Sequence, residues 1–278
     1  MISLEQVYSY FPNLEKTELL KKGMLREYVQ FMILDFLSTS PFINRLILVG
    51  GPAIRFKYGL DRFTRDLFFN FVDCSEDDFI KMTDSVISFL EKAGVKVESK
   101  YKENPSQVLL KRYLYFPKFL FNIKLSVFDE KRFFTSIGAI PNKLMQGSTI
   151  KTEIEKFGFK HKLALGFNSG FETINGCGFS FLFPMPSISV LFSMKLGALI
   201  LRQNGRDFYD GLFLKKFAKP DYVFLKHRVG VSNKAELHAK IAEALKYINL
   251  ERKTKDVEHL VFDKKNLERI KNFWKLIL

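Results

Sequence analysis

The sequence is poor in cysteine and has no long uninterrupted apolar run. Its two cysteines, Cys74 and Cys177, form no CxxC pair, so a disulfide framework is excluded and we expect a reducing cytoplasm. The longest apolar candidate, residues 179–194, is broken by Pro184 and Pro186, so no membrane span and no membrane partner are expected. The N-terminal residues also lack the basic-then-apolar pattern of a secretory signal.

Familiar cofactor and metal motifs are also missing. The sequence contains no Walker A, GxGxxG or GxSxG segment, so it gives no sign of a P-loop, a Rossmann dinucleotide site or a hydrolase nucleophile elbow. Its four histidines form no HxH or HExxH pattern and do not indicate a zinc site.

Basic residues are in excess. The chain has 44 Lys and Arg residues and 30 Asp and Glu residues, which gives a net charge of +14. Residues 211–278 contain 16 of the Lys and Arg residues and 8 of the Asp and Glu residues. A basic surface attracts polyanions such as RNA, with an affinity that falls as salt rises. Lysines that only solvate amphipathic helices would give the same composition, and the sequence leaves both interpretations open.

Apolar periodicity predicts a first half of strands and helices and a helical second half. We expect helices over 14–38, 52–59 and 75–94, and strands over 45–50, 66–72, 95–101, 106–115 and 119–128. Further helices are expected over 187–203, 206–218, 234–248 and 265–277, whereas residues 135–180 show no clear period. The sequence therefore predicts an α/β (α+β) fold, with a mixed sheet flanked by helices in residues 1–180 and a helical C-terminal domain in residues 181–278.

Two glycines separate the first expected strand from the helix after it. Because they have no side chains, Gly50 and Gly51 let the backbone approach a phosphate, and free N–H groups at a helix start can point at it. The same strand–Gly–Gly–helix pattern also occurs in ordinary tight connections, so this feature alone does not establish a site.

One face of the second expected strand carries polar residues. Residues two apart on a strand share a face, which here presents Thr64, Asp66, Phe68 and Asn70. Two carboxylates at positions 66 and 68 would hold Mg²⁺ against nucleotide phosphates. The sequence supplies only Asp66. A bulge or a shifted register would instead bury Phe68 in the core.

Charged residues surround the predicted junction of two C-terminal helices. Lys195 and Arg202 lie on one stripe of the first helix, and Asp207 and Asp210 share a face of the second. A lysine and an aspartate there could serve a triphosphate and a proton transfer. The alternative is structural: Asp207 stabilises its helix start, and Arg206 pairs with Asp210.

These segments together resemble a known family. Residues 50–69, GGPAIRFKYGLDRFTRDLFF, resemble the GGTALR…YGL.RFSEDLDF segment of the abortive-infection (AbiEii/AbiGii-type) toxin nucleotidyltransferases, within the polymerase-β-like nucleotidyltransferase superfamily. Residues 195–214, KLGALILRQNGRDFYDGLFL, resemble the later K.AL..R…RD.YDL segment of that family. Both segments occur in order, and the resemblance covers roughly residues 20–220.

The resemblance implies the fold and the chemistry of that family. It implies a nucleotidyltransferase-type mixed sheet, transfer of a nucleoside monophosphate (NMP) from an NTP with Mg²⁺, RNA as an acceptor, and an antitoxin as a partner. The resemblance implies that the nucleotide is bound by Gly50, Gly51, Thr64 and Arg202. It implies that the catalytic residues are Asp66, Lys195 and Asp207, and that Asp66 is also the metal ligand.

Two departures leave the activity open. Phe68 stands where the family has its second aspartate, and Ser126 stands where many members place a third carboxylate. Mg²⁺ binding is therefore expected to be weak or dependent on substrate. The chain is either a nucleotidyltransferase that acts as a toxin, or an impaired member that binds nucleotide or nucleic acid through a basic cleft. We expect Gly50, Asp66 and Lys195 to converge on one cleft between the two halves.

Overall fold

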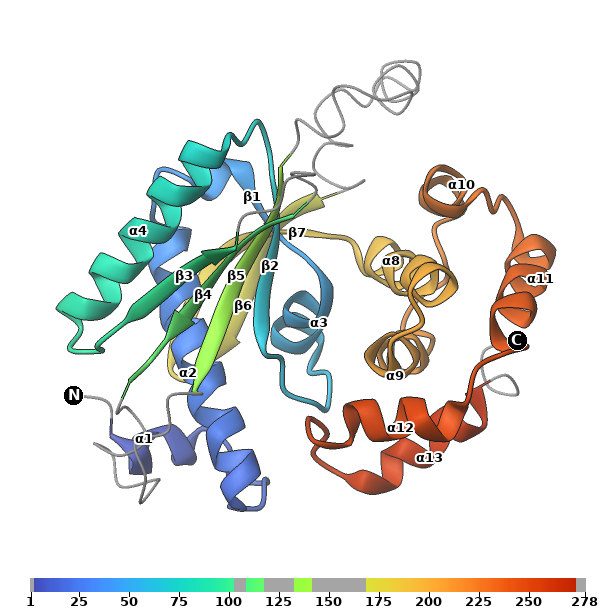
Figure 1. Cartoon of the computed structure of the whole chain (residues 1–278), viewed down its shortest axis with the longest axis horizontal. Helices are drawn as coiled ribbons and strands as arrows, with labels where there is room; N and C mark the ends of the chain where they lie inside the picture. The colour runs from blue at the N-terminus through green and yellow to red at the C-terminus, as the bar shows by residue number, and fades with distance from the viewer. Residues whose placement is uncertain (1–2, 103–108, 118–132, 142–168, 274–278) are drawn as a thin grey trace.

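The computed structural model describes residues 3–102, 109–117, 133–141 and 169–273. The architecture is mixed α/β, with a sheet flanked by helices and a helical C-terminal half, as the sequence predicts (Figure 1). The expected strand over 119–128, which includes Ser126, lies outside the described residues. Within the described ranges, no helix has both the length and the apolar character needed to cross a bilayer.

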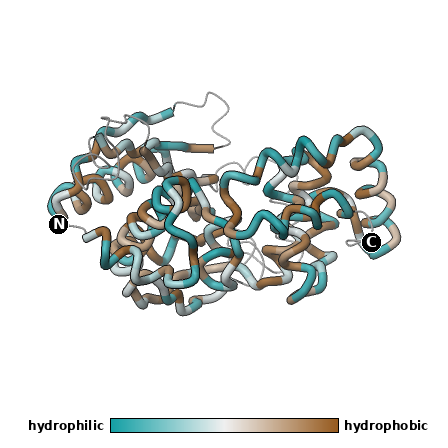
Figure 2. The backbone as a smooth tube through the Cα atoms, turned by 90° about the horizontal axis from the view of Figure 1, so that it is seen from below, coloured by the Kyte–Doolittle hydropathy of each residue, from teal (hydrophilic) through white to brown (hydrophobic). Residues whose placement is uncertain are grey.

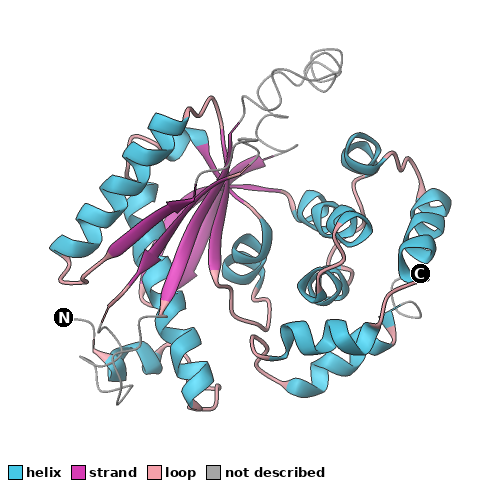
Figure 3. Ribbon diagram, in the orientation of Figure 1, coloured by secondary structure: helices cyan, strands magenta, loops and turns pink. Residues whose placement is uncertain are grey.

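The main sheet has five strands in the order β1-β2-β5-β4-β3. Helices lie on both sides of the strands (Figure 3). The strands are β1 (Leu46–Leu48), β2 (Asp66–Phe71), β3 (Glu98–Lys102), β4 (Leu110–Tyr115) and β5 (Phe134–Pro141). β2 and β5 are parallel, and the other neighbours are antiparallel. β2 alternates half-buried and buried residues in an unbroken register with β5, so Asp66 and Phe68 share one face, as predicted.

The first half also contributes the helices around the sheet. They are α1 (Leu4–Ser9), α2 (Glu18–Ser38), α3 (Gly50–Tyr58) and α4 (Glu76–Lys92), with a 3₁₀ turn, η1 (Ile43–Arg45). α2 and α4 lie on one side of the sheet, and α3 lies between the sheet and the C-terminal helices (Figure 1). α4 begins at the predicted Ser75 cap, where Ser75 and Asp78 exchange hydrogen bonds.

A hairpin forms a second, two-stranded sheet, made of β6 (Ser169–Gly176) and β7 (Phe179–Pro186). Phe183 of β7 packs on Phe69 of β2, with ring centroids 5.8 Å apart. This hairpin and β5 fall mostly in the region where the sequence shows no period. The proposed domain boundary at residue 180 lies within β7, and the division into two domains stays a prediction.

After the hairpin the described chain is helical. The helices are α8 (Ile188–Leu201), α9 (Gly205–Leu214), α10 (Tyr222–Val229), α11 (Lys234–Leu245), α12 (Leu250–Glu258) and α13 (Glu268–Lys271), with a 3₁₀ turn, η2 (Lys264–Leu267). Sequence periodicity did not predict α10 and α12, although Asp221 and Asn249 cap them with side-chain hydrogen bonds.

The segment between α3 and β2 joins the two halves. Phe63 N donates to Leu260 O at 2.9 Å, and Phe262 N donates to Asp61 O at 3.1 Å. Buried apolar residues of both halves form one core, and hydrophobic stretches of chain run through both (Figure 2). This segment therefore holds the start of β2 against the helical half.

Candidate functional site

α3 begins at the two glycines, two residues earlier than predicted. Gly50 has a φ of 73°, a left-handed conformation that favours glycine. The N-cap residue is Val49, whose side chain cannot accept a hydrogen bond, so the first N–H groups of α3 have no side-chain cap. A Cβ built on Gly51 would lie 3.0 Å from Arg62 Nη2, which places a guanidinium beside this helix start. The helix start therefore has the features of an anion site.

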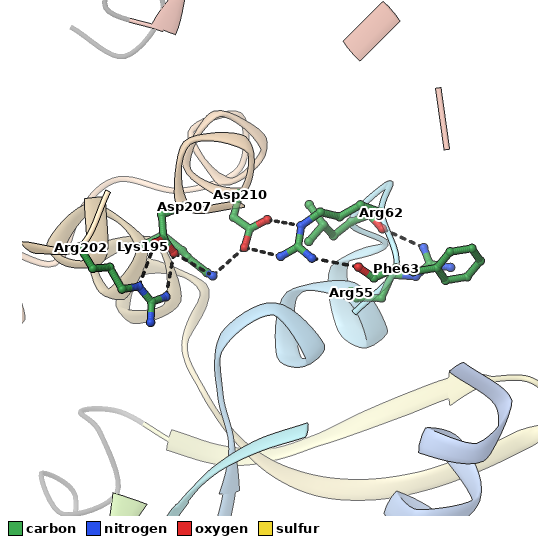
Figure 4. Close-up of polar contacts among 8 residues, drawn as sticks. Arg55, Arg62, Phe63, Lys195, Arg202, Asp207 and Asp210 are labelled. Carbon is green, nitrogen blue, oxygen red and sulfur yellow. Dashed lines mark hydrogen bonds and ion pairs between the residues drawn. The ribbon is translucent and has the colours of Figure 1, made fainter. Parts of the chain in front are cut away.

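An ion-pair network joins α8, α9 and Arg62 (Figure 4). Arg62 donates to both carboxylate oxygens of Asp210 at 2.7 Å, and Lys195 Nζ lies 2.6 Å from Asp210 Oδ2. Lys195 Nζ also lies 3.5 Å from Asp207 Oδ1. Arg202 donates to both oxygens of Asp207, at 2.9 and 2.8 Å. The structure thus brings three predicted residues together and, through Arg62, beside the start of α3.

Burial and ion pairing shift the pKa values of Asp210 and Arg202 in this network. Burial by itself raises the pKa of Asp210, but the positive charges of Arg62 and Lys195 outweigh it and lower that pKa to about 2. The hydrogen bonds to Asp207 raise the pKa of Arg202. Asp210 is therefore a buried anion whose ion-pair partners are Arg62 and Lys195, not Arg206 as the structural alternative expected.

Asp66 opens β2 on the sheet face that it shares with Phe68. Ser136 of β5 donates to Asp66 Oδ1 at 2.5 Å, and Lys111 Nζ of β4 lies 3.7 Å from the same oxygen. The Phe68 ring packs over Gly138, where a Cβ would lie 2.9 Å from the ring. Phe68 is half-buried on this face and is not part of the core.

The described residues of this face do not fit a resident metal ion. Among the residues that the structure describes, no group of three or more His, Cys, Asp and Glu side chains could hold one. Asp66 is the carboxylate that β2 offers, and the adjacent parallel strand presents Ser136 beside it. Mg²⁺ requires near-ideal coordination by oxygen, whereas the groups around Asp66 include a hydroxyl, a ring and an ammonium.

Thr64 is buried, and its hydroxyl forms a hydrogen bond with Gln30 of α2. The hydroxyl donates to Gln30 Oε1 at 3.2 Å, and Gln30 Nε2 in turn donates to Thr135 Oγ1 of β5 at 3.1 Å. The Thr64 methyl group faces Gly51, 3.4 Å from a Cβ built there. A contact between Thr64 and a nucleotide stays a prediction.

Sequence reasoning missed an arginine cluster near Asp66, made of Arg26, Arg65 and Arg206. Arg26 Nε donates to Phe134 O at the start of β5, at 2.9 Å. Burial lowers the pKa of Arg26, to about 10, and that of Arg206, and the charge of Arg65 lowers both further. The negative charge of Asp66 raises the pKa of both arginines and so partly offsets these shifts. The cluster therefore carries a local surplus of positive charge.

His259, the residue after α12, belongs to the same neighbourhood. Burial lowers its pKa, and the charges of Arg65 and Arg206 lower it further. In the described part of the chain, neither of these two arginines has an ion-pair partner. Guanidinium groups without such partners suit phosphate oxygens. The signal in the sequence is Arg65 itself, which stands at the Glu position of the RFSEDLDF segment.

Comparison with known proteins agrees with this fold. The family model described as "Nucleotidyl transferase AbiEii toxin, Type IV TA system" matches residues 33–228. The structure of MenT4, a nucleotidyltransferase toxin from Mycobacterium tuberculosis H37Rv, superposes on this chain with a TM-score of 0.52 at 13% sequence identity. The match covers 100% of this chain and 99% of the MenT4 chain. JHP933 from Helicobacter pylori is 14% identical with a TM-score of 0.50, covering 95% of this chain and 93% of its own. These two similarities support the fold alone, and no curated protein matched the chain.

Proposed function

Because the chain belongs to the AbiEii nucleotidyltransferase toxin family, we propose that it binds a nucleoside triphosphate with the phosphates at the start of α3. The observation that carries this proposal is the start of α3, where Gly50 has a left-handed φ of 73° and the first N–H groups have no side-chain cap. The guanidinium of Arg62, which is buried and paired with Asp210, adds positive charge beside Gly51. Uncapped N–H groups at a helix start, with a positive charge nearby, are the elements of a phosphate site. In this proposal Lys195 acts through Asp210, which holds Arg62 in place.

RNA is the proposed second ligand. The arginine cluster near Asp66 and the surplus charge of residues 211–278 supply groups that neutralise backbone phosphates. The family description names a toxin–antitoxin system, so an antitoxin is the proposed protein partner. The cytoplasm, where NTPs and RNA meet, is the proposed location.

The site favours binding of nucleotide and RNA without efficient transfer. Transfer of an NMP group depends on stabilising the charge of the phosphoryl oxygens. At this face Phe68 replaces one carboxylate, and Lys111 lies beside the other. Among the described residues of this face, Asp66 is the carboxylate that could share Mg²⁺ with the phosphates of an NTP, so the metal would bind weakly and together with substrate.

NMP transfer from NTP to RNA is the second candidate. It is favoured by the hydrogen bond from Val49 N to Phe68 O, 2.9 Å long, which places the start of α3 next to the strand that carries Asp66. In that function Asp66 holds the metal and Asp207 handles a proton. Both oxygens of Asp207 accept hydrogen bonds from Arg202, so this pair would have to open first.

Two measurements on the full chain separate these functions. Equilibrium dialysis measures NTP binding, and incubation with α-labelled NTPs, total RNA and Mg²⁺ or Mn²⁺ measures transfer. Retained NTP without label in RNA supports the proposal. Label that enters RNA and disappears in an Asp66→Asn variant establishes transfer instead. A chain that neither retains NTP nor labels RNA contradicts both functions.

A further inference from the structure

Lys111 lies where a cation between positions 66 and 68 would lie. Its Nζ is 3.7 Å from Asp66 Oδ1, 5.7 Å from the centre of the Phe68 ring and 4.9 Å from that of Tyr113. The contact with Asp66 is too long for a hydrogen bond, and no residue in the described ranges accepts one from this ammonium. A lysine ammonium has three N–H donors. With 18% of the side chain exposed, these donors are available to a ligand.

Strand pairing fixes this position. Phe68 pairs with Gly138 of β5, and Gly138 pairs with Lys111 of β4, so the three residues form one row across the sheet. Gly138 has no side chain, and Lys111 therefore extends over the Phe68 ring. On the other side of Phe68, its carbonyl oxygen accepts a hydrogen bond from Val49, the residue before α3. The row thus leads from the lysine to the helix start that binds phosphate in the proposed function.

We propose that Lys111 takes the place of a divalent ion at Asp66, so that this face binds the triphosphate of an NTP without a metal. The proposal rests on the proposed function, because it assigns the cation for the phosphates at α3. The two rings beside Lys111 stabilise an ammonium by cation–π attraction and offer no ligand to Mg²⁺. A lysine binds phosphate as a point charge.

The first test measures the binding of tripolyphosphate, which carries no base, to the full chain by titration calorimetry. We expect binding in EDTA that excess Mg²⁺ does not strengthen. Lys111→Met should weaken binding in EDTA about tenfold, because a charge-assisted contact to phosphate is lost. Lys102, the exposed cross-strand neighbour of Lys111 on β3, provides the matched control. Lys102→Met should stay within about twofold of the wild type.

An Asp66→Asn variant gives opposite results for the two roles of Asp66. If Lys111 replaces the metal, the carboxylate competes with phosphate for the ammonium, so asparagine should strengthen tripolyphosphate binding in EDTA about threefold or more. If Asp66 holds a metal, asparagine should weaken binding in Mg²⁺. The amide oxygen can still accept the hydrogen bond from Ser136, which keeps the local fold. This variant tests the proposal even where Lys111→Met fails to fold.

The outcomes separate this inference from the proposed function. Binding that appears only after Mg²⁺ is added overturns the metal-free assignment and leaves the phosphate site at α3 standing. The same conclusion follows if Asp66→Asn loses binding in Mg²⁺, or if Lys111→Met binds as tightly as the wild type in EDTA. No binding of tripolyphosphate under either condition overturns the phosphate site at α3 as well.

Discussion

Lys195 Nζ lies 2.6 Å from Asp210 Oδ2, the same oxygen that accepts a hydrogen bond from Arg62 Nη2. All three side chains are buried, with exposed fractions of 7%, 0% and 2% for Lys195, Asp210 and Arg62. Two cations therefore share one buried anion. Through Asp210, Lys195 is linked to Arg62 and to the start of α3. Its contact with a nucleotide stays a prediction.

Asp210→Ala is expected to destabilise the fold by about 3–5 kcal/mol, because it leaves Arg62 buried without its anion and Lys195 with only the longer contact to Asp207. Urea unfolding followed by circular dichroism measures the change. Asp256, an exposed aspartate on α12, gives the control. Asp256→Ala should change the free energy of unfolding by less than about 0.5 kcal/mol. A loss below about 1 kcal/mol at position 210 would mean that the two cations find other partners.

Local signals in the sequence predicted much of the frame of this site. The alternation of β2 placed Asp66 and Phe68 on one face, because the side-chain period of a strand is local. Ser75 and Gly59 predicted where α4 begins and where α3 ends, since caps depend on neighbouring residues alone.

The contacts that decide the chemistry could not be predicted in the same way. Arg62 and Asp210 are 148 positions apart, and their pairing follows from the packing of α9. β5 contains Gly138 and Ala139, residues with little preference for strands, and it forms through its pairing with β2 and β4. Lys111 meets Asp66 only because β5 lies between their strands.

Stability is expected to fall as the pH drops below about 6.5, through the contribution of His259. Burial first, and then Arg65, Arg206 and Arg26, lower the pKa of His259 from 6.5. The unfolded chain, with the higher pKa, takes up the proton first, and protonation therefore favours unfolding. Thermal melts from about pH 8 to about pH 5 measure this effect, and His259→Gln should flatten the profile over that range. An unchanged profile would contradict this role of His259.

RNA affinity is expected to fall steeply with salt and to depend on the arginine cluster. Arg65→Gln and Arg206→Gln should each weaken binding at every salt concentration. Each should also reduce the slope of log affinity against log salt by about 0.7, the value for one phosphate contact to a single strand. Filter binding over a salt series measures both quantities. Lys81, exposed on α4, provides the control, and Lys81→Gln should leave the slope unchanged.

Gly138→Ala is expected to destabilise the fold by about 1–3 kcal/mol, because the new Cβ would lie 2.9 Å from the Phe68 ring. Phe68→Ala in the same chain should relieve this clash, so the two substitutions should be non-additive in urea unfolding. Gly170 of β6 has open space where a Cβ would lie, and Gly170→Ala serves as the control. Additive effects at positions 68 and 138 would contradict the packing of the ring on Gly138.

Phe68→Asp is expected to strengthen the binding of Mn²⁺ or Mg²⁺ in the presence of NTP. The unbroken register of β2 places position 68 on the face of Asp66, so a carboxylate there is directed at the same ion. Phe68 is half-buried beside an ammonium, and the cost in stability should therefore be small. In thermal melts with NTP present, adding Mn²⁺ should raise the melting temperature of Phe68→Asp further, an increase that the wild type lacks. A severely lowered melting temperature without that rise would place Phe68 in the core instead.

Two further variants distinguish a metal site from a new ion pair with Lys111. Phe68→Asn removes the same ring without adding charge, so it should show no metal-dependent rise in melting temperature. In Phe68→Asp, Lys111 competes with the metal for both carboxylates, because its Nζ already lies 3.7 Å from Asp66 Oδ1. Phe68→Asp combined with Lys111→Met should therefore bind Mn²⁺ and NTP more tightly than Phe68→Asp alone. Weaker binding by the double variant would mean that the lysine supports the metal-bound nucleotide and does not compete with the metal.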